Sequence, residues 1–320
     1  MESPALLSGG IEWPADGSTP RWDLRTRHGE SADLVLEPGI RCSFAVAPGR
    51  WCLGHVLVHA VGGWEHVECP RASRAERGTQ CGPCLALDQA RYMHDFHRSG
   101  IAPPGLREYL ARPQWLYVAT FAHGASKVGT AGEGNKWRRL AQQGAVAGTY
   151  VALVADGRQV RVLEDLVTGR LGLGQAVRAS AKTAGLCEPG QGGPSAAGVY
   201  DAVSLARVHR SEVERVLALI AEDRQARELG IEPADEAFVP PRPAAAMLSA
   251  WDAGELYPYP GWLSASTHGF VVDSVLGQSL GVRLEGSDRL YAADAAVLKG
   301  RRVTPGEYTT AIPAAQDSLF

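Results

Sequence analysis

Three cysteines and a histidine in the first third of the chain have the types and spacing of metal ligands. Cys81 and Cys84 form a Cys-x-x-Cys pair, Cys69 lies upstream, and His97 lies downstream. The tight turn of such a pair brings two thiolates onto one tetrahedral ion, and three sulfurs with one imidazole suit zinc. A closed site of this kind stabilises a fold and leaves no open position for catalysis. We therefore predict a structural Zn²⁺ bound by Cys69, Cys81, Cys84 and His97.

The sequence leaves the fourth ligand open. His94 lies one helical turn before His97 on the same stretch, whose helical character is expected over 85–96, and Cys42 or Cys52 can replace the histidine. A redox-active Cys-x-x-Cys pair is the competing interpretation. The strand-helix-strand pattern that surrounds such redox pairs is missing here, which favours zinc.

A second group of polar residues lies in the middle of the chain. Tyr117 and Lys127 belong to two short runs with strand character, and Arg139 and Glu164 belong to two later runs with helical spacing. Singly, each side chain has an ordinary interpretation as a core aromatic or a solvated charge. Together at this spacing, they favour one shared site. The charges near this site are mostly positive. Glu133 is the one acid and Trp137 lies among the cations, which are Lys127, Lys136, Arg138 and Arg139.

The order of these residues resembles that of the GIY-YIG endonucleases. In that family two short strands carry the name motifs, a helix carries an arginine, and a later helix carries a glutamate. Residues 116–118 (Leu-Tyr-Val) and 127–129 (Lys-Val-Gly) stand at the two motif positions. The chain is also similar to a bacterial family of unknown function that has a cysteine-rich, zinc-like segment before such a domain. The specific part of the resemblance runs from 114 to 183.

The resemblance implies metal-assisted hydrolysis of a phosphodiester. Tyr117 would help to activate water, Arg139 would stabilise the charge that develops on the phosphate, and Glu164 would hold Mg²⁺ or Mn²⁺. Lys127 stands where the second motif usually has tyrosine. A lysine there can handle a proton if its pKa is lowered, or bind an anion. Residues 183–185 offer no asparagine where the family tends to place another polar site residue.

The elements that would position these residues give an α+β fold. The expected regions are a β-rich N-terminal region at 1–66, a cysteine-rich zinc segment at 67–105, a small GIY-YIG-like α/β domain at 114–186, a helical extension at 199–237 and a small C-terminal β domain at 247–310. Within the extension, the capping box at Ser211 predicts a helix that begins there and ends at Leu229. The proline-rich stretch 238–246 has the composition of a linker.

Composition limits the classes of function. The chain carries 32 basic and 35 acidic residues and a net charge of -3, so binding of a polyanion must depend on a local patch. The first ten residues lack the pattern of a secretory signal, and no apolar run has the length of a membrane span, which predicts a cytoplasmic protein without a membrane partner. Six cysteines in 320 residues are too sparse for a disulfide scaffold.

Three functions are compatible with these residues. The first is a zinc-containing, divalent-metal-dependent nuclease or nucleic-acid-processing protein acting on DNA or RNA. The second is a non-catalytic nucleic-acid-binding or regulatory module, which the lysine at 127 favours. The third is an enzyme that uses the same pocket for a small anionic metabolite, which the acidic net charge favours.

Overall fold

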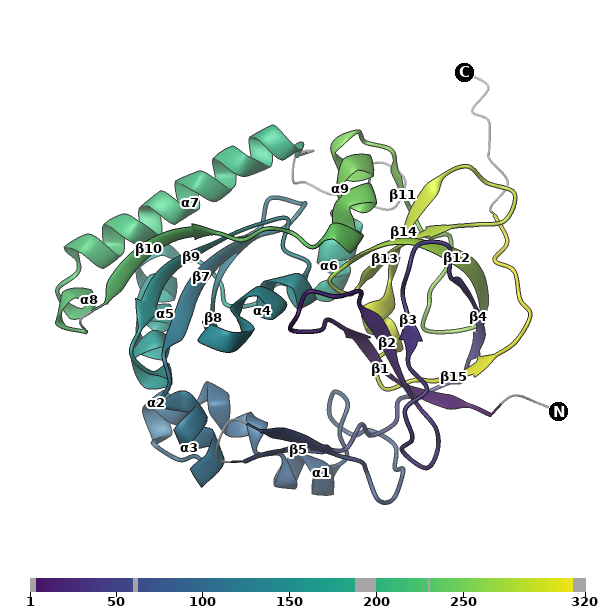
Figure 1. Cartoon of the computed structure of the whole chain (residues 1–320), viewed down its shortest axis with the longest axis horizontal. Helices are drawn as coiled ribbons and strands as arrows, with labels where there is room; N and C mark the ends of the chain where they lie inside the picture. Colours follow the sequence, from purple (N-terminus) through teal and green to yellow (C-terminus); the bar gives the residue numbers. More distant parts are fainter. Residues whose placement is uncertain (1–3, 60–62, 188–199, 230, 313–320) are drawn as a thin grey trace.

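The computed structural model describes residues 4–59, 63–187, 200–229 and 231–312. Two β-sheets lie side by side, and a segment rich in cysteine and short helices connects them (Figure 1). The fold is therefore mixed α+β, as the sequence predicts. Part of the expected boundary near residue 199 falls outside the described residues.

The larger sheet has nine strands that come from both ends of the chain. Its order is β11-β14-β13-β12-β4-β15-β1-β2-β3. The strands are β1 Leu6–Glu12, β2 Arg21–Arg25, β3 Leu34–Val35, β4 Arg41–Val46, β11 Leu256–Pro258, β12 Thr267–Leu276, β13 Ser279–Arg283, β14 Leu290–Asp294 and β15 Arg302–Pro305.

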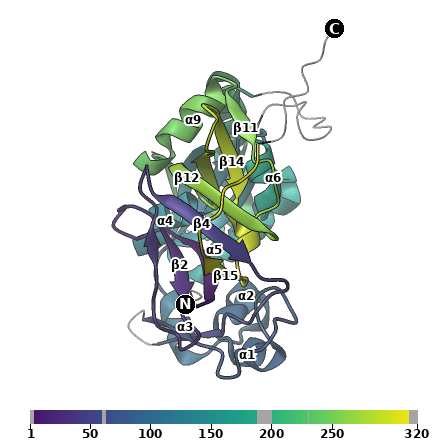
Figure 2. The same cartoon turned by 90° about the vertical axis from the view of Figure 1, so that its right-hand side faces the viewer.

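Strand β15 lies between β1 and β4, and β4 pairs in turn with β12 (Figure 2). The separate β regions expected at 1–66 and 247–310 are therefore wrong as independent units. Each region alone leaves strands unpaired, and only together do they form a continuous hydrogen-bonded sheet.

The smaller sheet has four strands in the order β10-β9-β7-β8 and holds the second group of polar residues. The strands are β7 Gln114–Thr120, β8 Ser126–Gly132, β9 Ala147–Val154 and β10 Glu232–Ala237. Side chains alternate along β7: Leu116 and Val118 pack with helices α5 (Gly157–Leu171) and α7 (Ala202–Glu222), whereas Trp115 and Tyr117 belong to the core shared with the larger sheet. Helix α4 (Lys136–Gln143) packs on this second side through Leu140.

Helices cover the sheets and close the loops between strands. They are α4 Lys136–Gln143, α5 Gly157–Leu171, α6 Ala179–Ala184, α7 Ala202–Glu222, α8 Arg224–Glu228 and α9 Ala245–Asp252, with 3-10 turns at Glu133–Asn135, Arg242–Ala244 and Ala295–Leu298. Asp156 caps α5 by accepting hydrogen bonds from the backbone N–H groups of Arg158 and Gln159, both at 2.8 Å.

Two expectations about helices and linkers are wrong. Helix α7 begins at Ala202, because Asp201 and Ser204 form a reciprocal capping box there, so Ser211 lies inside the helix. The stretch 238–246 is not a linker. Phe238 and Ala244 are buried, and the stretch leads directly into α9.

The cysteine-rich segment contains a two-stranded sheet and short helices. They are β5 His55–Val58, β6 Trp64–Val67, α1 Gly82–Leu87, a 3-10 turn at Ala90–His94 (η2), α2 Phe96–Ser99 and α3 Pro104–Leu110. The continuous helix expected at 85–96 is thus broken into separate turns. Asp88, at the C-cap of α1, has an extended backbone, with φ -66° and ψ 110°.

Candidate functional site

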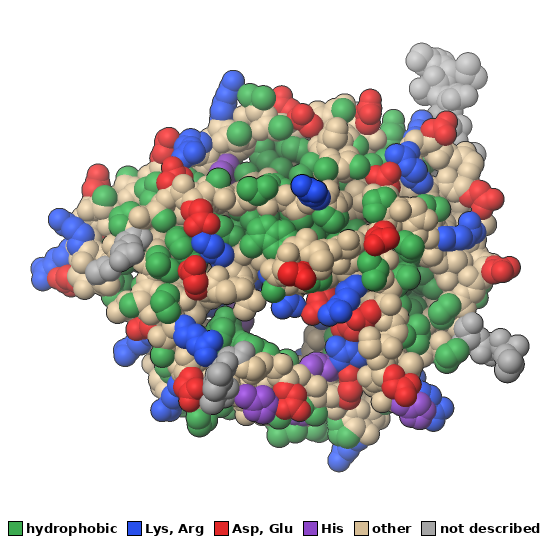
Figure 3. Space-filling view, in the orientation of Figure 1, with side chains coloured by type: hydrophobic (Ala, Val, Ile, Leu, Met, Phe, Trp, Pro, Cys, Tyr) green, Lys and Arg blue, Asp and Glu red, His purple; other side chains and the backbone are tan. Residues whose placement is uncertain are grey.

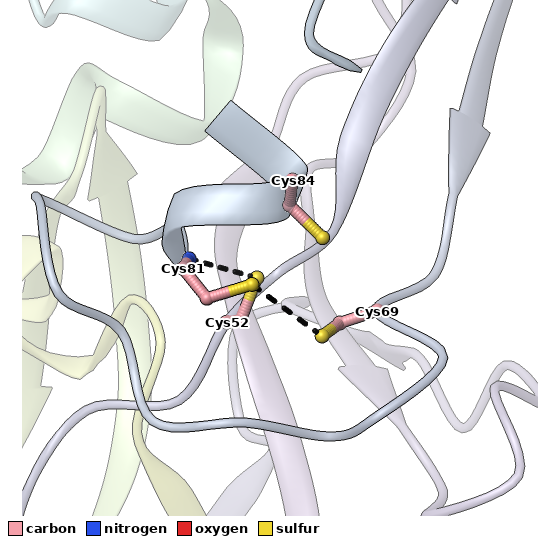
Figure 4. A group of neighbouring side chains, drawn as sticks. All are labelled: Cys52, Cys69, Cys81 and Cys84. Atoms are coloured by element: carbon pink, nitrogen blue, oxygen red, sulfur yellow. Dashed lines mark hydrogen bonds between the residues drawn. The ribbon is translucent and has the colours of Figure 1, made fainter. Parts of the chain in front are cut away.

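Four cysteine side chains converge in the cysteine-rich segment (Figure 4). The Sγ atoms of Cys52, Cys69, Cys81 and Cys84 all lie within 4.8 Å of one another, and those of Cys69 and Cys81 are 3.9 Å apart. Four sulfurs at about 2.3 Å from a tetrahedral zinc would lie about 3.8 Å from each other. The donor set and its spacing therefore fit a metal ion such as Zn²⁺.

Local structure holds each sulfur in place. Cys81 is the N-cap of α1 and Cys84 lies in its first turn, so the turn of the Cys-x-x-Cys pair aims both at one point. The backbone N–H groups of Gly54 and Cys81 donate to Cys52 Sγ at 3.3 and 3.2 Å. Such donors stabilise a thiolate, which is the form that binds metal.

The electrostatics of the cluster also favour a cation. Burial raises the pKa of Cys84, and the three neighbouring cysteines raise it further. Burial works against the Cys69 thiolate too, but backbone N–H groups of Ser73 and Arg71 lower its pKa to about 7. Four crowded thiols lose their protons together only when a positive ion compensates their charge.

The structure corrects the predicted fourth ligand from His97 to Cys52. His97 Nε2 lies 3.1 Å from Asp165 Oδ2 on α5, and Arg98 binds the same oxygen at 2.6 Å. Cys42, another alternative, is buried in the nine-stranded sheet.

The second group gathers at the β8 edge of the four-stranded sheet. Tyr117 on β7 is fully buried, and Gln143 Nε2 donates to its hydroxyl at 2.6 Å. Gly129 lies directly opposite on β8, and a Cβ at that position would be 2.4 Å from the Tyr117 hydroxyl. Burial raises the pKa of Tyr117, while Arg139 lowers it by charge and by a hydrogen bond.

Lys127 places a buried amine over this tyrosine. Its Nζ lies 5.5 Å from the centre of the Tyr117 ring and donates to the carbonyl of Gln175 at 3.2 Å. Burial, and after it the charge of Arg139, lowers its pKa to about 8, against the opposing effect of Glu164. An amine with this pKa exchanges a proton close to neutral pH.

Glu164 on α5 supplies an acid to the same place. Its side chain is 3% exposed and accepts a hydrogen bond from Arg161 at 2.5 Å. Burial raises its pKa, and Arg161 and Lys127 counteract that effect. A single carboxylate, completed by substrate oxygens and water, is a common way to hold Mg²⁺. Here the ion would have to displace Arg161 from the carboxylate.

Two further cations belong to this group, of which Lys182 was not expected from the sequence. Arg161 joins the group through Glu164, and Lys182 on α6 lies 4.3 Å from the ring of Phe121 and donates to the Gln143 carbonyl at 3.0 Å. Burial lowers the pKa of Lys182 to about 8, and the charges of Lys127 and Arg139 contribute. The group therefore gathers excess positive charge and favours an anion.

Two cations expected near the site have other partners. Lys136 pairs with Glu236 at 2.7 Å, and Arg138 pairs with Glu12 at 2.9 Å. These contacts tie α4 to β10 and to β1. The local basic cluster expected from the sequence is thus divided between a site and two structural ion pairs.

The exposed guanidinium of Arg139 marks the side from which the group can be reached. Burial, together with the charges of Arg161 and Arg139, lowers the pKa of His94 in η2, so these arginines lie near that turn of the cysteine-rich segment. In space-filling view an opening passes between the region of α4 and the segment that holds β5 (Figure 3). Lys and Arg side chains lie beside this opening.

Comparisons with known proteins add no relative. No family model matches the chain, and neither a curated protein nor a solved structure is significantly similar to it. Within the described residues, no helix combines the length and apolar character needed to cross a bilayer.

Proposed function

We propose that this chain is a metal-dependent nuclease-like protein with a structural zinc site and a GIY-YIG-like catalytic domain at 114–186. The observation that carries the proposal is the convergence of Tyr117, Lys127, Arg139 and Glu164 at one sheet edge. A strand, a second strand, a helix and a later helix supply them in the order that the resemblance implies.

The chemistry of each side chain suits phosphodiester hydrolysis. The Arg139 guanidinium, exposed at the mouth, would bind the phosphate with paired hydrogen bonds. Lys127, with a pKa of about 8, would accept a proton from the attacking water, and the Tyr117 hydroxyl would orient that water. Glu164 would hold Mg²⁺ or Mn²⁺, which would supply charge stabilisation at the phosphate.

Zinc would act on this site from a distance. A closed four-cysteine centre would join β5, β6 and α1, and η2, which follows in the same segment, lies near Arg139. Zinc bound at the cysteines would thus stabilise one wall of the opening beside the site.

A specific contact favours a second candidate, a non-catalytic nucleic-acid-binding module. Arg161 neutralises Glu164 through a buried ion pair, so the carboxylate that would hold Mg²⁺ already has a partner. In that case the cations bind a phosphate and no bond is broken.

Cleavage assays test the proposal. The zinc-loaded chain would be incubated with labelled DNA and RNA in Mg²⁺ or Mn²⁺, next to Glu164→Gln and Arg139→Ala. We expect both variants to lose at least about a hundredfold in rate, while Glu228→Gln and Arg224→Ala, matched changes in an exposed pair on α8, retain it. Zinc content and thermal unfolding would verify that each variant is folded.

The remaining outcomes separate the candidates. Cleavage that persists in Glu164→Gln contradicts the assigned role of that residue. Salt-sensitive binding without cleavage supports the non-catalytic module. Salt-insensitive binding of a small anion, without nucleic-acid binding, supports the enzyme acting on an anionic metabolite.

A further inference from the structure

A cluster of arginines surrounds one tryptophan next to the cysteine centre. The Cζ atoms of Arg74 and Arg302 lie 4.2 and 3.4 Å from the centre of the Trp51 ring. Arg50 precedes this tryptophan, and Arg301 precedes Arg302. We call these four arginines, with Trp51, the basic patch.

Backbone contacts fix the patch although its parts are distant in sequence. The Trp51 N–H donates to the Gly300 carbonyl at 2.6 Å, and the Ala75 N–H donates to the Arg50 carbonyl at 3.0 Å. Trp51 also forms an isolated β-bridge with Arg74. The next residue along the chain, Cys52, belongs to the metal centre. The patch is therefore a preorganised surface and not a set of free side chains.

The positive charge of the patch is uncompensated. Residues 47–54, 70–80 and 296–304 hold seven Lys or Arg residues and one acid, Glu76, in a chain whose net charge is -3. The ion pairs among the described residues include none of the four patch arginines.

Mutual repulsion and an unused donor indicate that the patch can accept an anion. Burial lowers the pKa of Arg302, as does the nearby charge of Arg74, and Arg301 is affected in the same way by Arg50. The indole N–H of Trp51 is buried and has no acceptor within the described part of the chain. An anion at this surface would relieve the repulsion between the guanidinium groups.

We propose that the basic patch binds the phosphate backbone of a nucleic acid. Guanidinium groups spread over a rigid surface match a row of phosphates, and arginine is the side chain best suited to them. Two arginines already pack against the Trp51 ring, so the recognition is of phosphates and not of stacked bases. A lipid surface is disfavoured because the large apolar side chains that are exposed elsewhere in the molecule are missing from the patch segments as described.

The inference rests on the proposed function, since it takes the same polymer as the ligand. It assigns the polymer a second point of contact, separate from Tyr117, Arg139 and Glu164. Loss of the patch should therefore raise KM for a long substrate and leave kcat unchanged, because the patch does not touch the reacting phosphate.

Salt-dependent binding of a labelled DNA duplex to the zinc-loaded chain tests this role. Between roughly 50 and 200 mM salt, Arg50→Ala with Arg74→Ala should lower the slope of log affinity against log salt by about 2 and weaken binding roughly tenfold. Arg50→Lys with Arg74→Lys, which keeps both positive charges, should keep most of the wild-type slope. Arg224→Ala, an exposed charge on α8, is the matched control and should behave as wild type.

Both substituted side chains are exposed, and zinc content with thermal unfolding verifies the fold. If Arg74→Ala unfolds the chain, Arg50→Ala alone should lower the slope by about 1. An unchanged slope overturns the inference, as does a wild type that binds anionic vesicles but no DNA or RNA. Binding by the patch without cleavage contradicts only the nuclease proposal. Cleavage with unaltered KM in the patch variants contradicts only the patch.

Discussion

Burial disfavours the charge of the Lys127 amine, and the nearby charge of Arg139 adds to that effect. The Lys127 pKa of about 8 lies below the ordinary 10.5, so the folded protein releases this proton as the pH rises through about 8. If the neutral amine accepts the proton of the attacking water, the cleavage rate should increase over this pH range and level off above it. Lys127→Arg, which keeps the charge at all these pH values, should remove the increase and lower the rate by about a hundredfold. The pH profile of kcat measures both effects.

Lys182 provides the comparison for that profile, because its pKa is also about 8 and burial is again the main cause. Lys182→Gln should retain an increase in rate near the same pH, since Lys127 is still present. If the increase disappears with Lys182→Gln and persists with Lys127→Arg, then Lys182 and not Lys127 accepts the proton.

Gly129 leaves room for the tyrosine of the candidate site. In Gly129→Ala the new Cβ would lie 2.4 Å from the Tyr117 hydroxyl, in a place where both strands are buried. We expect the free energy of unfolding to fall by about 1 to 3 kcal/mol, because the ring must shift against its neighbours. Urea denaturation measures the change. Gly134→Ala, with no atom within 4 Å of the added Cβ, should change it by less than about 0.5 kcal/mol.

At the scale of elements, local patterns predicted more than distant pairings did. The runs that contain Tyr117 and Arg139 predicted a strand and a helix where β7 and α4 lie, because strand-favouring residue types and helical spacing are contained in the runs themselves. The start of α7 was missed because Ser211 has the residue pattern of a capping box, while Asp201 forms the actual one. A residue pattern that satisfies a local capping rule is no proof that a helix begins there.

The candidate site shows the same limit. Tyr117, Lys127 and Glu164 were found through the order of motifs, whereas Lys182 lies on a short helix without a signature and joins them only through tertiary packing. Cys52 was one of several open choices for the fourth ligand. Only the return of the chain after β6 brings it near Cys69.

The metal centre yields a prediction about the whole cysteine-rich segment. Cys52→Ser should lose bound zinc, about one ion per chain in the wild type, and should lower the thermal midpoint. The reason is that the four sulfurs hold β5, β6 and α1 together. Elemental analysis of the purified chain and thermal unfolding with and without a chelator measure these effects.

His97→Ala and Cys42→Ala are the controls for that prediction. Both residues lie outside the cluster, so both variants should keep their zinc. The modest cost of His97→Ala should come from its lost contact with Asp165 at 3.1 Å. Zinc that survives Cys52→Ser but is lost in His97→Ala would restore the histidine as the fourth ligand.

At the scale of the molecule, strands from opposite ends of the chain complete one sheet, and that sheet shares a core with the smaller one. The largest cluster of buried side chains includes Trp13 and Val303 from the ends, Trp115 and Tyr117 from β7, and Leu140 from α4. Short β-like runs near each terminus indicated strands but not their partners. Pairing between residues nearly 300 positions apart, such as Leu6 with Val303, leaves no periodic trace in either run.

Val303 tests whether the two sheets unfold as one unit. It is 1% exposed on β15 and pairs with Leu6 of β1 on one side and Val46 of β4 on the other. Val303→Asp buries a charge without a partner and should lower the free energy of unfolding by about 3 kcal/mol or more. Because the core is continuous, hydrogen exchange should accelerate in β1 and β4 and also in β7. Thr304→Asp, a partly exposed neighbour, should cost less than about 1 kcal/mol. Faster exchange confined to the larger sheet, with β7 unchanged, would mean that the four-stranded sheet and its candidate site are stable independently of the chain ends.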